Sequence, residues 1–229
     1  MVNVVAINAS PRQGRGHTGM ILAPFLEGLQ DEGATVDLFY ASKLKVKPCS
    51  CGHFYCWYQT PGECVYKDSM TALYDAVTKA QILVVGSPVY SPAPGDLQNI
   101  LNRFVPLLEP MLEFRHGRTR ARLREDVQLE KVVLVAGTGW WEKENANLLR
   151  HVIEEFAENA SITFSGALVR PHIYAMQTDQ GVTEDGKRVL SAIRQGGREL
   201  IRIGGFKQET LDDISRPLLP REDYEEYLG

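Results

Sequence analysis

The chain has 229 residues, of which 44% are hydrophobic and 24% charged, the balance of a globular protein with a sizeable core. Its formal net charge of −4 argues against binding to nucleic acid or to an anionic membrane, and no apolar run is long enough to span a bilayer. The N-terminal residues 1–8 lack the basic segment and the length of a secretion signal, so we expect a cytoplasmic protein.

Short apolar runs alternate with stretches of helical period along the chain, a pattern typical of a parallel sheet covered by helices. The predicted strands are residues 2–8, 34–40, 82–86, 131–137 and 162–169. The predicted helices are residues 18–32, with Gly33 as the C-cap, and residues 96–108, 143–159 and 184–203. We therefore expect one α/β domain, residues 1–229, with a doubly wound five-stranded parallel sheet and a ligand crevice at the carboxyl ends of its strands.

Three segments lie outside this predicted pattern of strands and helices. They are a loop at 44–68 that contains all four cysteines, an arginine-rich stretch at 113–126, and a C-terminal tail at 206–229. The arginines could attract an acidic partner or the 2′-phosphate of NADPH, but we expect a solvated loop or an oligomer contact paired with acidic residues.

The loop after the first strand reads ASPRQGRGHTG (residues 9–19) and opens a helix. Free N–H groups at a helix start favour a phosphate, and Ser10, Arg12 and Thr18 add further donors. The sequence matches neither the P-loop pattern nor Gly-x-Gly-x-x-Gly, so ATP and a dinucleotide are not indicated. A plain N-cap with a glycine turn is the alternative interpretation.

The loops after the third and fourth strands carry aromatic residues and glycines at the same predicted sheet edge. An isoalloxazine ring needs an apolar face and hydrogen bonds at its edge, which such loops can provide. A stiff surface loop and a tryptophan pair in the core or in an oligomer contact are the alternatives, and we assign Trp141 to packing. The candidate ring contacts are Pro88, Val89, Tyr90, Ser91, Thr138, Gly139 and Trp140.

All four cysteines lie in one segment of 16 residues, with the spacing C-x-C-x4-C-x7-C. Four thiolates in one loop can bind a [4Fe–4S] cluster or a tetrahedral zinc ion, although structural zinc usually has two C-x-x-C pairs. Reduced structural thiols are the third interpretation. The candidate ligands are Cys49, Cys51, Cys56 and Cys64.

These motifs together resemble two groups of flavoproteins. Ser-Pro-Arg followed by Gly-His-Thr resembles the FMN-phosphate loop of NADPH-dependent FMN reductases, with His17 where asparagine is usual. Ser-Pro-x-Tyr with Asn102-Arg103-Phe104 resembles the same reductases. Cys-Trp-x-x-Thr-Pro-Gly-x-Cys, the following Asp-x-Met and the tail at 214–222 resemble iron–sulfur flavoproteins, whose first cysteines usually follow C-x-x-C-x-x-C instead.

The resemblance implies a flavodoxin-like fold with FMN bound noncovalently and with no catalytic side chain. The phosphate of FMN would contact Ser10, Arg12, His17, Thr18 and Gly19. Its ring would contact the loops after the third and fourth strands. A [4Fe–4S] cluster on the four cysteines would lie near the FMN, with the cysteine loop folded over the same sheet edge.

The implied function is an FMN-dependent oxidoreductase that passes electrons from NAD(P)H or ferredoxin to a small acceptor. The implied assembly is a homodimer or homotetramer, and we expect the apolar tail residues Leu218, Leu219, Tyr224, Tyr227 and Leu228 to pack against a neighbouring subunit. The alternatives are a cluster-free NAD(P)H-dependent quinone reductase and a flavin-binding interaction or sensor protein with structural cysteines.

Overall fold

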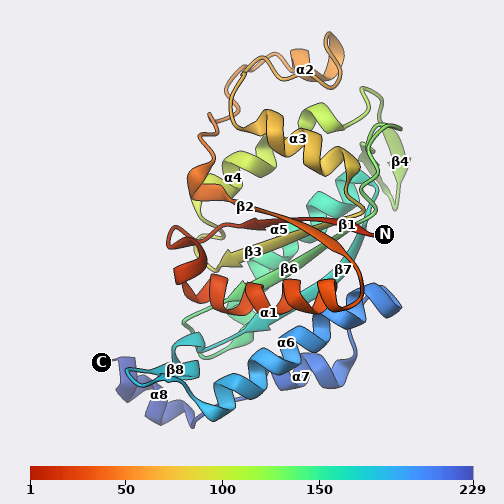
Figure 1. Ribbon diagram of the computed structural model, residues 1–229. Helices are drawn as coiled ribbons and strands as arrows, with labels where there is room; N and C mark the ends of the chain where they lie inside the picture. The colour runs from red at the N-terminus through yellow and green to blue at the C-terminus, as the bar shows by residue number, and fades with distance from the viewer. Residues whose placement is uncertain (229) are drawn as a thin grey trace.

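A five-stranded parallel sheet runs through the centre of the computed structural model, which describes residues 1–228 (Figure 1). Its strands are β1 (Asn3–Asn8), β2 (Thr35–Tyr40), β3 (Ile82–Pro88), β6 (Lys131–Gly137) and β7 (Thr163–Arg170). They lie in the order β2-β1-β3-β6-β7, which is the doubly wound order of flavodoxin-like proteins. The inner strands are almost wholly buried, as expected of strands that are covered on both faces.

Helices cover both faces of the sheet. On one face lie α1 (His17–Asp31), α6 (Glu184–Ile203) and α7 (Gln208–Ser215), and on the other lie α3 (Met70–Lys79), α4 (Gly95–Asn102) and α5 (Asn147–Ala160). Each face encloses its own apolar cluster. Helices α1 and α6 approach so closely that a Cβ atom on Gly28 would lie only 2.0 Å from the carbonyl oxygen of Arg194, so the contact requires glycine at this position.

The observed bounds follow the sequence pattern closely, with departures at the ends of three helices. The predicted helix 184–203 has the bounds of α6. The predicted helix 96–108 is wrong beyond Asn102, where the chain turns into a short 3-10 helix, Val105–Leu107, because Pro106 cannot continue an α-helix. The predicted helix 143–159 begins with a 3-10 turn, Lys143–Ala146, before α5. The observed C-cap of α1 is Glu32, and Gly33 follows it with a φ of +80°.

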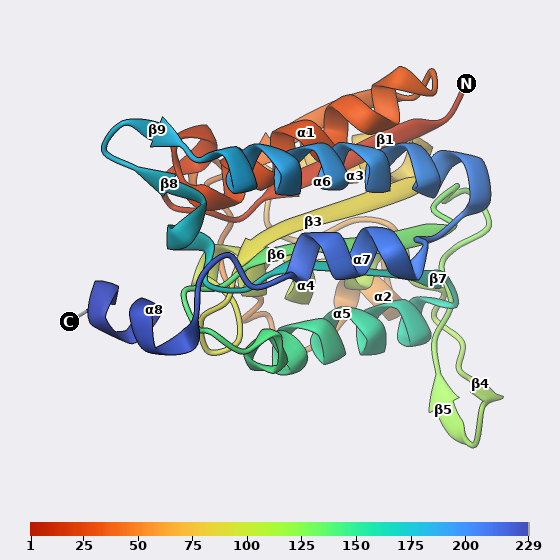
Figure 2. The same cartoon turned by 90° about the horizontal axis from the view of Figure 1, so that it is seen from below.

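Two small hairpins and a short helix lie outside the sheet. The arginine-rich hairpin of β4 (Glu113–Arg115) and β5 (Arg118–Arg120) projects from the body of the protein (Figure 2). Its Arg118 and Arg120 contact the carboxylate of Glu155 at 3.0 and 2.8 Å, so these arginines are paired with an acid within the same chain. The second hairpin, β8 (Gln177–Thr178) with β9 (Gly181–Val182), precedes α6, and the short helix is α2 (Tyr55–Tyr58).

A buried ion pair fastens the cysteine loop to the end of α4. The side chain of Arg103 is 1% exposed and donates to both carboxylate oxygens of Asp68, at 2.9 and 3.2 Å. It also donates to the carbonyl oxygen of Lys47 at 2.7 Å. Burial alone would raise the pKa of Asp68, but hydrogen bonds from Arg103 and from the N–H groups of Lys47 and Met70 hold that pKa below its usual value. The loop is therefore anchored at both of its ends.

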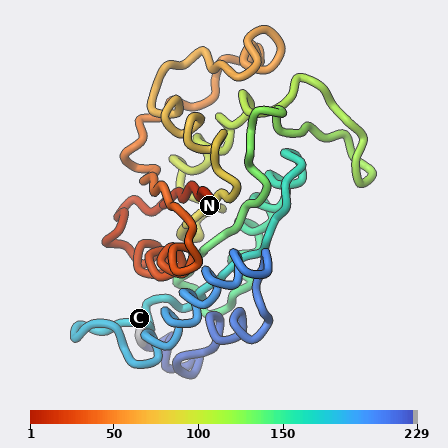
Figure 3. Tube along the Cα trace, turned by 45° about the vertical axis from the view of Figure 1, so that its right-hand side comes forward, coloured from red at the N-terminus to blue at the C-terminus, as the bar shows by residue number. Residues whose placement is uncertain are grey.

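The C-terminal tail packs against its own chain, on the opposite side of the molecule from the cysteine loop (Figure 3). After α7 the tail continues to α8 (Arg221–Leu228). Tyr224 is 1% exposed within its own chain, so the expectation that it faces a neighbouring subunit is wrong. Leu218 packs against the α1/α6 core cluster and, like Leu219, is half-buried. The side chains of Tyr227 and Leu228 lie outside the described residues. Within residues 1–228, no helix combines the length and the hydropathy needed to cross a membrane.

We expect Asp68→Ala to lower the free energy of unfolding by about 3 to 5 kcal/mol, because it leaves the buried guanidinium of Arg103 without its carboxylate. Amide exchange should accelerate across residues 45–69. Lys67→Ala is the neighbouring control, since the side chains of Lys67 and Glu63 are 72% and 73% exposed in their ion pair. Lys67→Ala should lower the free energy of unfolding by less than about 1 kcal/mol, as measured by urea titration. Equal losses in the two variants would contradict a specific role for the buried pair.

Candidate functional site

The loop after β1 is folded by its own short-range hydrogen bonds. The side-chain oxygen of Asn8 accepts the N–H of Ser10 at 2.9 Å, and the hydroxyl of Ser10 accepts the N–H of Arg12 at 3.2 Å. Gly16 is the N-cap of α1, and a Cβ atom there would lie 2.6 Å from the Ser10 hydroxyl oxygen. The loop thus brings a serine, an arginine and a helix start together, and the first N–H groups of a helix have no partner within it.

A cavity of about 190 Å³ lies at the carboxyl ends of four neighbouring strands. Its walls come from the loop after β1, the ends of β3 and β6, and the segment after β7. The parallel register brings these segments together, since Asn8 pairs with Gly86, Pro88 with Gly137, and Gly137 with Arg170. The lining residues are Ser10, Pro11, Arg12, Gly16, His17, Thr18, Pro88, Val89, Tyr90, Gly137, Gly139, Ile173 and Tyr174.

Most of the predicted FMN contacts line this cavity, but four do not. Gly19 packs against the Gly14 backbone, where a Cβ atom would meet the Gly14 carbonyl oxygen at 2.6 Å. Thr138 is buried behind the wall, and its hydroxyl accepts the N–H of Trp140 at 3.1 Å. Trp140 is 62% exposed beyond the lining residues, and Ser91 is also exposed. Tyr90, which lines the cavity, is 58% exposed, so both it and Trp140 present aromatic surface to solvent.

Ile173 and Tyr174, which were not among the predicted contacts, line the cavity from the segment after β7. The available signal was their position, because they follow the fifth predicted strand at the same sheet edge as the other loops. A Cβ atom on Gly139 would lie 2.6 Å from the ring of Tyr174, so this glycine lets the two loops meet.

His17 stands at the start of α1 with its ring edge-on to Tyr174, at a centroid distance of 5.0 Å. Its Nε2 lies 2.8 Å from the amide nitrogen of Gln177. An amide N–H can only donate, so this contact fits a neutral imidazole. Burial, aided by the charge of Arg12, lowers the pKa of His17. Because His17 is neutral, Arg12 provides the positive charge among the residues that line the cavity.

A buried cluster behind the cavity joins the tail to the loop that follows β6. Arg170 is fully buried and donates to the carbonyl oxygens of Ile214 and Arg216 at 2.8 and 2.9 Å, and also to Nε2 of His172. The His172 ring stacks on Trp141 at 4.5 Å, which agrees with the packing role expected for Trp141. The Tyr224 hydroxyl donates to the carbonyl oxygen of Gly139 at 2.6 Å. The tail thus holds the Gly139 backbone from behind.

The four cysteines lie in the loop outside α3 and α4, and none of them lines the cavity, so the expectation that their loop covers this sheet edge is wrong. All four are free thiols, with Cys56 and Cys64 buried and Cys49 exposed. Burial, and then the other three cysteines, raise the pKa of Cys56 to about 11, so the thiols lie within electrostatic range of one another. Within residues 1–228, no three His, Cys, Asp or Glu side chains converge where they could hold a metal ion.

Comparison with known proteins gives sequence relatives for this chain. Residues 2–175 match the family described as NADPH-dependent FMN reductase. An iron–sulfur flavoprotein of Methanocaldococcus jannaschii is 30% identical over 119 residues, which are 51% of this chain and 58% of the relative. An iron–sulfur flavoprotein of Archaeoglobus fulgidus is 29% identical over 117 residues, or 50% of this chain and 57% of the relative. The chain thus spans a little over half of the length of these relatives.

Solved structures with the same fold include an NAD(P)H:quinone oxidoreductase from Methanothermobacter marburgensis. That structure has a TM-score of 0.61 and 17% identity, and the match covers 87% of this chain and 98% of the other. An azoreductase from Bacillus anthracis has a TM-score of 0.61 and 12% identity, with the same coverage of both chains. At such identities these likenesses concern the fold.

The buried His172 should make stability depend on pH. Burial, reinforced by the charge of Arg170, lowers the pKa of His172 to about 4, whereas an unfolded histidine titrates near 6.5. As pH falls below 6.5 the unfolded chain binds the proton first, so this contribution to stability is full above pH 6.5 and is lost toward pH 4. Between pH 7 and pH 5 the loss should be about 2 kcal/mol.

Urea denaturation at both pH values checks this expectation. His172→Phe keeps an aromatic ring but cannot take up a proton, so its stability should fall less between pH 7 and pH 5 than that of the wild type. His151→Phe is the control, because the side chain of His151 is 66% exposed. If the wild type and His172→Phe have parallel profiles, His172 does not titrate as described.

Proposed function

Because the chain belongs to the NADPH-dependent FMN reductase family, we propose that it is an FMN-dependent oxidoreductase that transfers electrons from NAD(P)H to a small acceptor. The observation that carries the proposal is the cavity in which four strand ends, a helix start and Arg12 meet. A ferredoxin donor remains part of the proposal, since the curated relatives are iron–sulfur flavoproteins.

The residues around this cavity fit FMN. Arg12, Ser10 and the start of α1 supply the positive charge and the N–H donors that a phosphate needs. Gly16 and Gly139 leave room where a side chain would collide with Ser10 or Tyr174. When bound, FMN supplies a ring that accepts a hydride or single electrons.

In this proposal the protein binds and orients FMN and its reaction partners, and it does not provide a catalytic acid or base. Arg12, Ser10, His17 and Thr18 hold the phosphate, with neutral His17 fixed by Gln177. Val89 and Gly139 approach the ring, and Tyr90 and Trp140 offer flat surfaces to the ring or to a planar acceptor. A quinone or azo compound is the class of acceptor that the names of the structural neighbours suggest.

We further propose that residues 1–229 form one domain and that the chain assembles as a homodimer or homotetramer. Burial of Ile214 and Tyr224 against the body of the protein supports one domain, and residue 229 lies outside the described residues. Self-association is supported by three apolar side chains beside and on the projecting hairpin. Met111, Leu112 and Phe114 are 72%, 57% and 79% exposed.

The FMN assignment predicts that Arg12→Ala combined with Thr18→Ala weakens FMN binding by about tenfold to a hundredfold, the loss expected for a charge-assisted contact. Fluorescence titration of apoprotein measures this. Riboflavin has no phosphate, so its affinity should change little in the same variant. Arg15→Ala is the matched control, because Arg15 is exposed in the same loop and does not line the cavity.

Turnover tests the proposed reaction in the same preparations. FMN-loaded wild-type protein should oxidise NADPH or NADH when a quinone is added, and the double variant should need more FMN to do so. An unchanged affinity for FMN in the double variant would overturn the assignment of the site. A flavin that stays oxidised with NADPH, NADH and reduced ferredoxin alike would overturn the proposed reaction.

We also propose that Cys49, Cys51, Cys56 and Cys64 bind one [4Fe–4S] cluster, as their thiol chemistry and the iron–sulfur relatives suggest. The type of ligand fits, but the arrangement in the structure does not, because no three of these sulfur atoms converge on one point within the described residues. Cluster binding would require the loop to draw its thiols together between the anchors at Lys47 and Asp68. No step of the proposed reaction depends on the cluster.

Iron and sulfide assays on protein purified without oxygen test the cluster directly. We expect close to four iron atoms for each FMN, the content of one [4Fe–4S] cluster. Cys56→Ser should lose most of the iron and keep the FMN, since the cysteines do not line the flavin cavity. Full flavin with no iron after reconstitution would leave the cysteines structural, and zinc found by metal analysis would identify a zinc site instead.

A further inference from the structure

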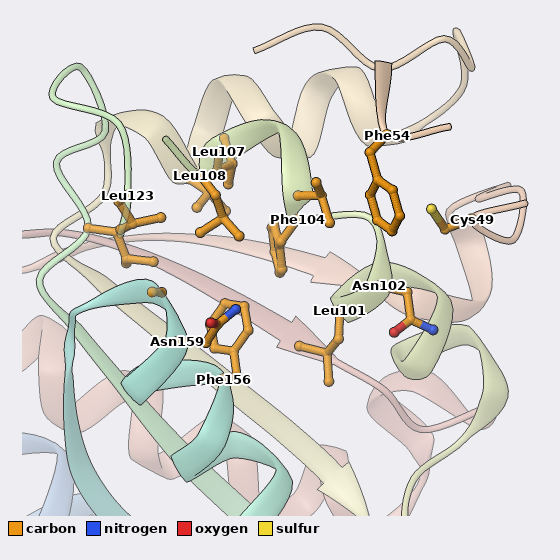
Figure 4. Close-up of a pocket in the computed structure, with 14 residues that line it drawn as sticks. Cys49, Phe54, Leu101, Asn102, Phe104, Leu107, Leu108, Leu123, Phe156 and Asn159 are labelled. Atoms are coloured by element: carbon orange, nitrogen blue, oxygen red, sulfur yellow. The ribbon is translucent and has the colours of Figure 1, made fainter. Parts of the chain in front are cut away.

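A second cavity, of about 350 Å³, lies under the cysteine loop on the α3/α4/α5 face of the sheet (Figure 4). Cys49 and Phe54 stand at one end of it and Leu123 at the other, with Phe104 and Phe156 between them. The rings of Phe104 and Phe156 have centroids 5.5 Å apart. The cavity therefore has an aromatic middle and reaches from the cysteine loop toward the end of α5.

The two cavities share no residue and lie at opposite edges of the sheet. Leu129 lines the second cavity just before β6 begins, whereas Gly137 lines the first where β6 ends. A seven-residue strand spans roughly 20 Å, which separates the two sites by about the length of the sheet. A molecule in the second cavity could not contact a ring held in the first.

The lining of the second cavity is chemically uniform. Eleven of its fourteen residues are apolar and none is charged. Its floor reaches the core, because Val77, Phe104, Leu107 and Leu129 are all no more than 5% exposed. The polar groups are the thiol of Cys49 and the amide of Asn102 toward one end of the cavity and the amide of Asn159 beside Phe156.

We propose that this cavity is a binding site for an uncharged aromatic small molecule, separate from the flavin site. Its volume falls within the range of small-molecule pockets, and an apolar site with a few polar groups is the usual lining of such pockets. A charged ligand would lose its hydration without gaining an opposite charge. The two asparagine amides can each satisfy one polar group of the ligand.

Other occupants fit the cavity less well. The C-terminal tail cannot fill it, because the tail packs on the α1/α6 face of the sheet. The surface of a folded partner could cover the mouth but would not reach the buried floor. A small molecule would touch Phe54 and Cys49 of the cysteine loop together with Leu101 at the end of α4, so its binding should also order that loop.

The test uses FMN-loaded protein and the uncharged fluorophore N-phenyl-1-naphthylamine, whose emission rises in apolar surroundings. We expect saturable binding at one site for each chain. Leu108→Trp enlarges a half-buried side chain that lines the cavity and should weaken binding at least tenfold. Leu190→Trp changes an equally half-buried leucine on α6, on the other face of the sheet, and should leave the affinity within about twofold. Leu123→Trp replaces Leu108→Trp if the latter does not retain FMN.

Hydrogen exchange locates the bound fluorophore. It should slow amide exchange at residues 49–54, 101–108 and 156–160 and leave residues 10–18 unchanged. Absence of saturable binding would overturn the proposal, as would equal weakening by the α6 variant. Release of FMN by the fluorophore would assign the fluorophore to the flavin site. Binding that disappears as protein concentration rises would show instead that a second copy of the chain covers the cavity.

Discussion

The candidate flavin site depends on one constraint, which is that the five strands of the sheet all point the same way. Parallel strands joined by crossovers through helices place every carboxyl end, and the loop after it, at one edge. The register then decides which loops touch, and it sets Asn8 beside Gly86 and Gly137 beside Arg170. Residues that are more than 160 positions apart in the chain, such as Ser10 and Ile173, thereby line one cavity.

The same constraint explains how much the sequence could reveal. Apolar periodicity predicted the five strands and the main helices, and the rule that ligands bind at strand ends selected the loops with Ser10, Tyr90 and Gly139. Tyr174 also follows a strand but belongs to no recognised motif, so the rule alone was not enough to find it. The helix predicted to reach residue 108 ended early because the local effect of Pro106 outweighed the apolar pattern.

Contacts between distant side chains were beyond the reach of sequence patterns. Arg103 and Asp68 are 35 residues apart, and nothing in the spacing of either indicates that they form a buried ion pair. Tyr224 and Gly139 are 85 residues apart and meet only because the tail folds back on its own chain. The predicted position of the cysteine loop was wrong for the same reason. The cysteine motif predicts a compact thiol site, but side-chain contacts that the motif does not encode place the loop outside α3 and α4.

The hydrogen bond from Tyr224 to Gly139 has a consequence for the order in which the protein can mature during synthesis. The four strand-end loops leave the ribosome well before Tyr224, and the loop that follows β6 has only part of its support until then. The buried Arg170 likewise cannot form its hydrogen bonds to the carbonyl groups of Ile214 and Arg216 until these residues, more than forty positions later in the chain, have been synthesised. A nascent chain can therefore form the sheet early, yet it completes the wall of the cavity only after nearly the whole of the described chain has been translated.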